Sequence, residues 1–226
     1  MSPVLSLYRS AVAKKAVMAV SGIVLFGFIL GHMLGNLKLY QGPEKINAYA
    51  EWLCQVGTPA LPDSGLLWIA RIVLLVAVFL HVLSATQLTL LNRKARPQAY
   101  KKRASIQATY AARTMRWGGV LIGLYVLYHL AHLTWGSAHP DFVPGDVYRN
   151  VVVGFRVWWV SAFYLAAQVA LGFHLYHGLW SMFQSLGWWQ PDNPHDWRRR
   201  FAQVFAWVIS LGNLSFPLAV LTGIVQ

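Results

Sequence analysis

Six of the eight histidines in this chain lie inside long apolar stretches, where ionisable side chains are uncommon. In a membrane such a side chain usually faces the interior of a helix bundle and has a partner there, because it is costly against lipid. Neutral imidazole is also the commonest metal ligand in proteins. One such histidine is equally well explained by hydrogen-bonded packing, but four stretches with histidines together predict ligands of a buried metal cofactor. The six are His32, His81, His129, His132, His174 and His177.

The elements that must position these histidines are long apolar helices. The chain has 226 residues, of which 57% are hydrophobic and only 12% are charged, so it is too apolar for an ordinary soluble domain. About 20 apolar residues span a bilayer core of about 30 Å. The sequence therefore predicts an all-α, polytopic membrane protein. We expect a single domain over residues 1–226, with a four-helix core that holds the cofactor. The five predicted transmembrane helices cover residues 15–39, 66–91, 115–137, 157–186 and 201–225.

The basic residues predict the orientation of these helices. Fourteen of the 19 Lys and Arg lie before the first helix, between the second and third, or between the fourth and fifth. Cytoplasmic loops carry such an excess of basic residues, so the N-terminus is expected in the cytoplasm and the C-terminus outside. The net charge of +12 then reflects topology and contact with anionic lipid headgroups. Because the basic residues are divided among short loops, the pattern argues against nucleic-acid binding.

The depth of each histidine indicates how they pair. In the predicted orientation, His32 lies about 9 Å outward from the middle of the first helix, at ~1.5 Å per residue. The two histidines of the third helix lie just outward of its middle. His81 lies near the middle of the second helix, and the two histidines of the fourth lie in its cytoplasmic half. We therefore expect an outer pair, formed by His32 and a third-helix histidine, and an inner pair, formed by His81 and a fourth-helix histidine.

Two bis-histidine haems stacked across the membrane would satisfy this pattern. Cys54 is the only cysteine and belongs to no CxxCH motif, so any haem would be of the b type. A porphyrin needs small side chains one helical turn from its ligand. By this criterion His174, which has Ala170 and Gly178 in those positions, is favoured over His177. The same criterion leaves the choice between His129 and His132 open.

Several short motifs resemble those of one family. The motifs are Ser21-Gly22, "GHMLGN" around His32, "FLH" ending at His81, "RWGGVLIGLYVLYH" ending at His129, and "FHLYHGLWSMFQSLG" around His174. In order and spacing the whole chain resembles the single-chain, five-helix, dihaem cytochrome b subunit that anchors succinate dehydrogenases and fumarate reductases. The resemblance implies that His32, His81, His129 and His174 ligate haem iron, with His132 and His177 as alternatives.

The resemblance also implies partners and a location. It predicts a flavoprotein subunit that carries out the succinate or fumarate chemistry, an iron-sulfur subunit, and a quinone, either menaquinone or ubiquinone. This chain would pass electrons and would have no catalytic residue of its own. The heterotrimer could form a higher oligomer, in a bacterial plasma membrane. The basic segment 92–113 is a candidate dock for the iron-sulfur subunit, although it could equally be a solvated loop.

Candidates for the other functional groups are less specific. Lys14 and Ser21 could bind a quinone at the inner end, and Asn36 with Glu51 could bind one at the outer end. Residues 40–65 could form a short interfacial helix, and His139 and His195 are expected to be solvated or interfacial. The candidate partners for haem propionates are Arg71, Gln87, Arg156 and Gln168.

Two other functions remain compatible with the sequence. One is a haem b anchor of a different respiratory oxidoreductase or a free-standing electron carrier. The other is a non-redox transporter whose histidines line a proton or metal path. That reading predicts acidic groups inside the helices, and the five predicted helices contain none.

Overall fold

The computed structural model describes residues 10–95, 110–188 and 196–226. His195 and most of the basic segment 92–113 lie outside these ranges. The secondary structure of the described residues is helical, with loops between the helices and no strand. Five helices are long and apolar enough to cross a membrane, in agreement with the prediction of an all-α, polytopic membrane protein. They are α2 (Ala11–Asn36, extended by the 3-10 turn η1, Leu37–Gln41), α4 (Gly65–Lys94), α5 (Tyr110–His129, extended by the π turn η3, Leu130–Thr134), α7 (Trp158–Ser185) and α8 (Trp197–Leu221).

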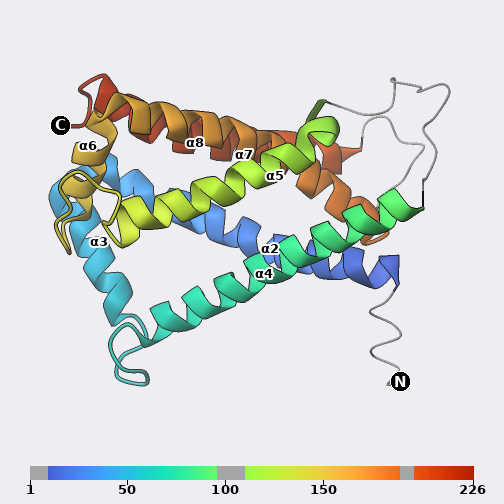
Figure 1. Ribbon diagram of the computed structural model, residues 1–226. Coiled ribbons are helices and arrows are strands. Elements are labelled where there is room, and N and C mark those ends of the chain that lie inside the picture. The colour runs from blue at the N-terminus through green and yellow to red at the C-terminus, as the bar shows by residue number, and fades with distance from the viewer. Residues whose placement is uncertain (1–9, 96–109, 189–195) are drawn as a thin grey trace.

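The five spans form two groups, which can be followed in Figure 1. In the first group α2 packs along α4, and in the second α7 packs against both α5 and α8. Contacts of α2 with α7 and α8 join the two groups along a seam. At this seam the sulfur of Met33 lies against Gly212, and the rings of Phe26 and Phe205 have centroids 4.0 Å apart. We call α2 with α4 the first half of the bundle, and α5 with α7 and α8 the second half.

Two short helices cover one end of the bundle. The first, α3 (Pro43–Gln55), confirms the short helix expected within residues 40–65. The second, α6 (Val147–Arg156), lies in a segment to which the sequence analysis assigned no helix. The two helices contact each other, and α6 also contacts α7 and α8. We call this the capped end, and it is the left-hand end in Figure 1.

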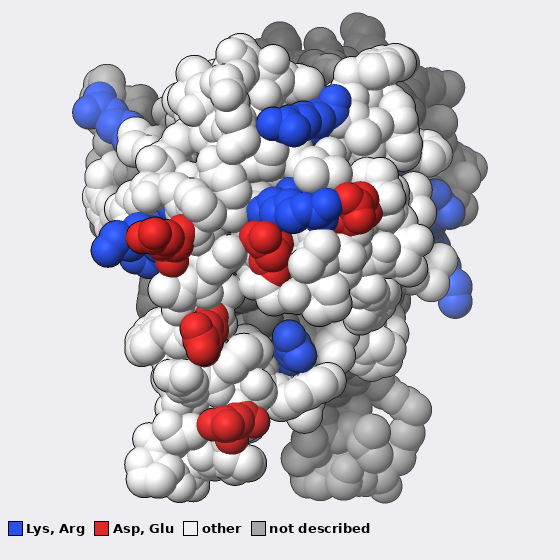
Figure 2. All heavy atoms as spheres, turned by 90° about the vertical axis from the view of Figure 1, so that its left-hand side faces the viewer, with Lys and Arg blue, Asp and Glu red and all other residues white. Residues whose placement is uncertain are grey.

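Charge differs between the two ends of the bundle. Figure 2 looks onto the capped end, where acidic and basic side chains alternate on the surface. Five of the seven acidic residues belong to this end: Glu44, Glu51, Asp63, Asp141 and Asp146. The described part of the opposite end carries mainly basic residues: Lys14, Lys15, Arg93, Lys94, Arg116, Arg198, Arg199 and Arg200, with Asp196. This is the asymmetry on which the predicted orientation rests.

Candidate functional site

The structure brings His32 and His129 together near the capped end. His32 comes from α2, and His129 is the last residue of α5. Their ring centroids lie 5.9 Å apart, and the two ring planes are nearly perpendicular, at 89°. Phe28, one turn earlier on α2, stacks on His32 at 5.2 Å. His32 is exposed and His129 is partly buried, so both rings keep accessible surface.

A second pair, His81 and His174, lies further toward the basic end. Their ring centroids are 6.2 Å apart, with the planes inclined by 58°. Each ring lies against a glycine of a neighbouring helix. A β-carbon at Gly22 would be 3.5 Å from Cε1 of His81, and one at Gly119 would be 3.8 Å from Cε1 of His174. His174 also lines a pocket of about 220 Å³ between α5 and α7, whose other walls are mostly small or apolar: Thr114, Met115, Gly118, Ala166, Val169, Ala170 and Phe173.

Each pair joins the two halves of the bundle. His32 and His81 belong to the first half, whereas His129 and His174 belong to the second. Within the described ranges no three His, Cys, Asp or Glu side chains gather as a metal site. Each pair could supply a metal with two protein ligands, one from each half.

The alternative third-helix histidine, His132, has a different environment. It lies in the π turn η3, is fully buried at 0% exposure, and is not paired with His32. Its Nδ1 lies 3.0 Å from the hydroxyl of Tyr164, and the same hydroxyl lies 3.3 Å from Nδ1 of His129. Nε2 of His132 has no hydrogen-bond partner among the described residues. A π turn widens the helix by one residue and is frequent at functional sites. Here the π turn ends the span formed by α5 and η3, and both His129 and His132 contact the hydroxyl of Tyr164 at this end.

Aromatic rings surround this outer group. Tyr125 and Tyr164 meet edge to face at 5.1 Å, and Phe155 of α6 lies edge to face against Tyr164 at 4.8 Å. Tyr128 stacks on His132 at 5.5 Å. The outer pair thus lies in a dense aromatic cluster, whereas the inner pair lies against glycines.

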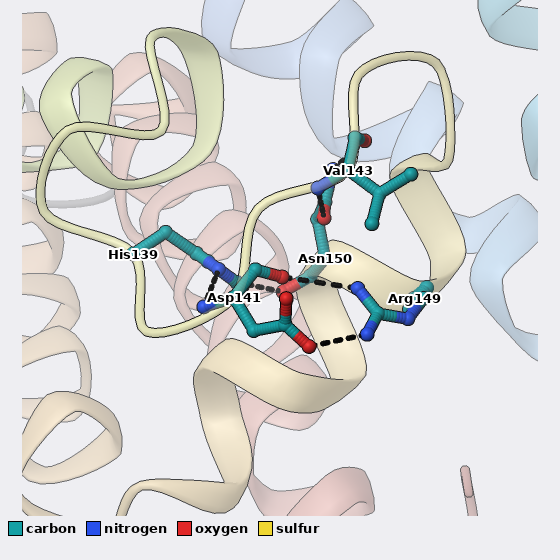
Figure 3. Close-up of polar contacts among 5 residues, drawn as sticks. All are labelled: His139, Asp141, Val143, Arg149 and Asn150. Atoms are coloured by element: carbon teal, nitrogen blue, oxygen red, sulfur yellow. Dashed lines mark hydrogen bonds and ion pairs between the residues drawn. The ribbon is translucent and has the colours of Figure 1, made fainter.

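His139 anchors the loop between η3 and α6, as Figure 3 shows. Its Nε2 lies 2.8 Å from the carbonyl oxygen of Asn150, and its Nδ1 accepts a hydrogen bond from the backbone N–H of Asp141. Because a carbonyl only accepts, the proton must be on Nε2, and the neutral ring uses both nitrogens. The same ring stacks on His132 with centroids 4.9 Å apart. His139 is thus partly buried and not freely solvated, and it links the loop to His132.

Polar side chains hold this loop against α6 (Figure 3). The side chain of Asn150 donates to the carbonyl oxygen of Val143 and accepts from its N–H, at 2.7 and 2.9 Å. Arg149 forms an ion pair with Asp141 and also donates to its carbonyl oxygen at 3.0 Å. These contacts hold the loop through its backbone as well as its side chains.

Asp146 connects the loop to α3. Its carboxylate caps α6 by accepting from the N–H of Arg149 at 3.1 Å, and it accepts from the Asn47 amide at 3.0 Å. Asn47 in turn accepts from the N–H of Tyr148. The hydrogen bonds from Arg149 and Asn47 lower the pKa of Asp146 below its usual value of 3.8.

The candidate quinone and propionate residues are dispersed. Ser21 is buried beside His81, with its hydroxyl 3.4 Å from Nδ1 of that ring, and Lys14 is buried two turns earlier on α2. Asn36 is partly buried at the end of α2, whereas Glu51 is exposed on α3. Of the propionate candidates, Gln168 donates to the hydroxyl of Tyr125 at 3.0 Å and is buried within the bundle. His177 lies one turn beyond His174 and is partly buried.

The residue that sequence reasoning missed is Tyr164. In the sequence it is one of 10 tyrosines, in a helix already assigned to the membrane. The available signal is its position ten residues before His174 on the same helix, nearly three turns away, which places it at the depth of the outer pair.

The chain matches a known protein family. The family described as the succinate dehydrogenase/fumarate reductase transmembrane subunit matches residues 92–213, which include both histidines of α7 and both third-helix histidines. No curated protein matches, and no solved structure matches. The matched segment covers more than half of the 226 residues. The chain therefore belongs to the family of succinate dehydrogenase/fumarate reductase transmembrane subunits.

Proposed function

We propose that this chain is the cytochrome b anchor of a succinate:quinone oxidoreductase and holds two b haems, one on His32 and His129 and one on His81 and His174. The observation that carries the proposal is that the four histidines meet in two pairs at different depths, in a chain of this family. Succinate oxidation or fumarate reduction takes place on a partner subunit, and this chain carries no residue for it.

The paired residues fit haem ligation. An imidazole binds a metal through one nitrogen at about 2 Å, so two imidazoles on opposite sides of one metal have ring centres roughly 6 Å apart. The observed separations of 5.9 and 6.2 Å agree with that value. Nδ1 of His81 lies 3.2 Å from the carbonyl oxygen of Met18, so it carries the proton and leaves Nε2 as the metal-binding nitrogen. Gly22 and Gly119 keep the space beside the inner rings free of side chains.

The protein's own contribution is to hold the four imidazoles and to exclude water. When bound, a haem accepts and releases single electrons, at a potential that its ligands and surroundings set. Both pairs lie between apolar helices, with His32 exposed at the edge of the bundle, and the capped end lies nearest the outer pair. Ser21 is buried beside His81 at the inner end, but its hydroxyl donates to the carbonyl oxygen of Val17 at 2.8 Å, so it would have to give up that bond to donate to a quinone carbonyl.

The partners follow from the family and the charge distribution. We place the iron-sulfur subunit, with its flavoprotein, at the basic end, which the positive-inside rule assigns to the cytoplasm of a bacterial cell. Electrons would then pass from the iron-sulfur subunit to the inner haem before the outer one, or in the reverse order for fumarate reduction. Menaquinone and ubiquinone are both compatible with the apolar surroundings of the two pairs.

The test is a reduced-minus-oxidised optical spectrum with pyridine-haemochrome quantification, on the complex purified with its native partners. We expect two b haems per copy of this chain and co-purification of a flavoprotein and an iron-sulfur protein. One haem per chain would eliminate one pair. The absence of haem would refute the proposal and favour a transporter, and different soluble partners would assign the chain to another respiratory enzyme.

A further inference from the structure

Two histidines share one phenol at the outer pair. The hydroxyl of Tyr164 lies 3.3 Å from Nδ1 of His129 and 3.0 Å from Nδ1 of His132. Tyr164 is 3% exposed and His132 is 0% exposed, so water does not compete for these contacts. At the inner pair the contacts differ: Nδ1 of His81 lies 3.2 Å from the carbonyl oxygen of Met18 and 3.4 Å from the hydroxyl of Ser21, and Nδ1 of His174 is buried with no partner among the described residues.

Counting hydrogens restricts the protonation of this group. A hydroxyl has one hydrogen, so Tyr164 can donate to only one of the two imidazoles, and if it donates to one it accepts from the other. If it accepts from His129, the proton of His129 is on Nδ1 and its Nε2 carries a free lone pair. If it donates to His129, Nδ1 is the acceptor and Nε2 of the neutral ring carries the hydrogen. Only the first arrangement leaves Nε2 of His129 able to bind a metal.

We propose that Tyr164, supported by His132, is the positioning residue of His129: it fixes the proton of that imidazole on Nδ1 and leaves Nε2 as the nitrogen that ligates the outer haem. This inference rests on the proposed function. His132 is then the acceptor of the Tyr164 hydroxyl and not a ligand. This role would explain why the third span carries a second histidine, His132, three residues after His129.

The capped end holds His132 in place for this role. His139 stacks on His132 at 4.9 Å and is itself fixed by Asn150 and Asp141. On another side, Gly154 of α6 approaches so closely that a β-carbon would be 2.7 Å from Nε2 of His132. Phe155 lies edge to face against Tyr164. The ring of His132 therefore has little freedom to turn away from the phenol.

The expected consequence is a difference between the two haems. A hydrogen bond donated by the second nitrogen of a ligating imidazole raises its basicity and fixes its ring orientation, and a more basic ligand favours ferric over ferrous iron. Tyr164 supplies this bond to the outer pair from a side chain. Its hydroxyl can accept strongly because it also donates to His132.

The test is Tyr164→Phe, compared with Tyr128→Phe, in the purified complex. The matched control deletes a hydroxyl of the same kind, from a ring that stacks on His132 and whose oxygen is buried with no partner among the described residues. The readouts are the two haem potentials from a redox titration and the low-spin EPR signals. The outer haem is identified as the one lost in His32→Ala.

We expect Tyr164→Phe to raise the potential of the outer haem and to alter its EPR signal. A threefold to tenfold change in the ferric-to-ferrous ratio corresponds to about 30–60 mV for a one-electron couple. Tyr128→Phe should leave both haems unchanged, and the inner haem should be unchanged in both variants. An unchanged outer haem in Tyr164→Phe, or an equal shift in Tyr128→Phe, would overturn the inference while leaving the two-haem proposal intact.

A second pair of variants tests the same link if Tyr164→Phe fails to assemble. His132→Asn retains an acceptor oxygen near the position of Nδ1, whereas His132→Leu removes it. We expect a wild-type potential in the first variant and a raised one in the second. Equal potentials in the two variants would show that His132 only fills space. A wild-type complex without haem would instead refute the proposed function itself, and this inference with it.

Discussion

Gly154 of α6 lies in van der Waals contact with the imidazole of His132, so that a β-carbon built on the glycine would be 2.6 Å from Cε1 of the ring. This contact couples the surface helix of the capped end to the aromatic cluster around the outer histidines. It also requires glycine at position 154 for steric reasons, although the backbone there is helical.

Gly154→Ala should therefore destabilise the complex. Neither His132, held between His139 and Tyr128, nor the backbone of α6 can move freely, and overpacking of this kind costs about 1–3 kcal/mol. We expect a lower thermal midpoint of the purified complex. Gly27→Ala is the control, because a β-carbon there meets nothing within 4 Å. Equal midpoints for the two variants would contradict the contact.

Haem content should separate the two third-helix histidines. His129→Ala removes the partner of His32 and should halve the haem content, whereas His132→Ala should retain both haems. The measurement is pyridine-haemochrome absorbance per mole of complex. A loss of haem in His132→Ala, with full content in His129→Ala, would exchange the two roles.

The same assay applies to the inner pair. His174→Ala should lose one haem and His177→Ala none, since His174 is the α7 histidine that lies beside His81. Retention of both haems in His174→Ala would require a different ligand on α7.

Asp146 should make the capped end sensitive to acid. Its pKa is lowered by hydrogen bonds from Arg149 and Asn47, so the charged carboxylate stabilises the folded state. This stabilisation is complete above the usual value of 3.8 and is lost as the pH falls through the lower pKa of the folded state. At neutral pH, Asp146→Ala should raise amide hydrogen exchange in the first turn of α6 about fivefold, as expected for an N-cap worth ~1 kcal/mol.

The control for Asp146 is Asp63→Ala, which removes an exposed acid from another loop at the same end. It should leave exchange in α6 unchanged. The difference between wild type and Asp146→Ala in thermal midpoint should shrink below pH 3.8. A difference that stays constant with pH would show that the carboxylate charge has no part in it.

Thiol labelling should establish the orientation. Cys54 is the only cysteine, so Cys54→Ser provides a background without thiols. In that background Glu44→Cys should react with a membrane-impermeant maleimide in right-side-out vesicles, and Arg199→Cys should react only in inverted ones. Both side chains are exposed, Glu44 on α3 and Arg199 at the start of α8. The opposite pattern would reverse the predicted topology and move the partner subunits to the capped end.

Hydropathy was sufficient to predict the five spans, because an apolar run of bilayer length has few alternatives to a transmembrane helix. Helix ends were less predictable. The last helix begins at Trp197 instead of 201, since the Asp196 carboxylate accepts from the N–H of Arg198 and caps a turn that carries three arginines. The short helix α6 escaped prediction because it is ten residues long, too short to cross a membrane, although Asp146 offered a capping signal.

The sequence was sufficient to predict which helices contribute each histidine pair. It was not sufficient to predict which histidine of the third helix takes part or which side chains surround it. Depth alone indicated that α2 pairs with α5 and α4 with α7. The choice between His129 and His132 could not be made from neighbouring side chains, because it depends on the π turn at residues 130–134 and on Tyr164, which comes from another helix. His139 likewise obtains its partners from a loop whose path only the folded structure defines.

The seam between the two halves has a consequence for how the protein is made. The hydroxyl of Tyr40, in the turn η1 that ends the first span, donates to Ser215 of the fifth, 175 residues later, and Met33 packs on Gly212 of the same helix. If the helices enter the membrane in order of synthesis, the seam surface of the first half faces lipid until α7 and α8 follow, and the seam is complete only with the last span. Until α5 and α7 are made, His32 and His81 lack the imidazoles that lie beside them in the finished bundle.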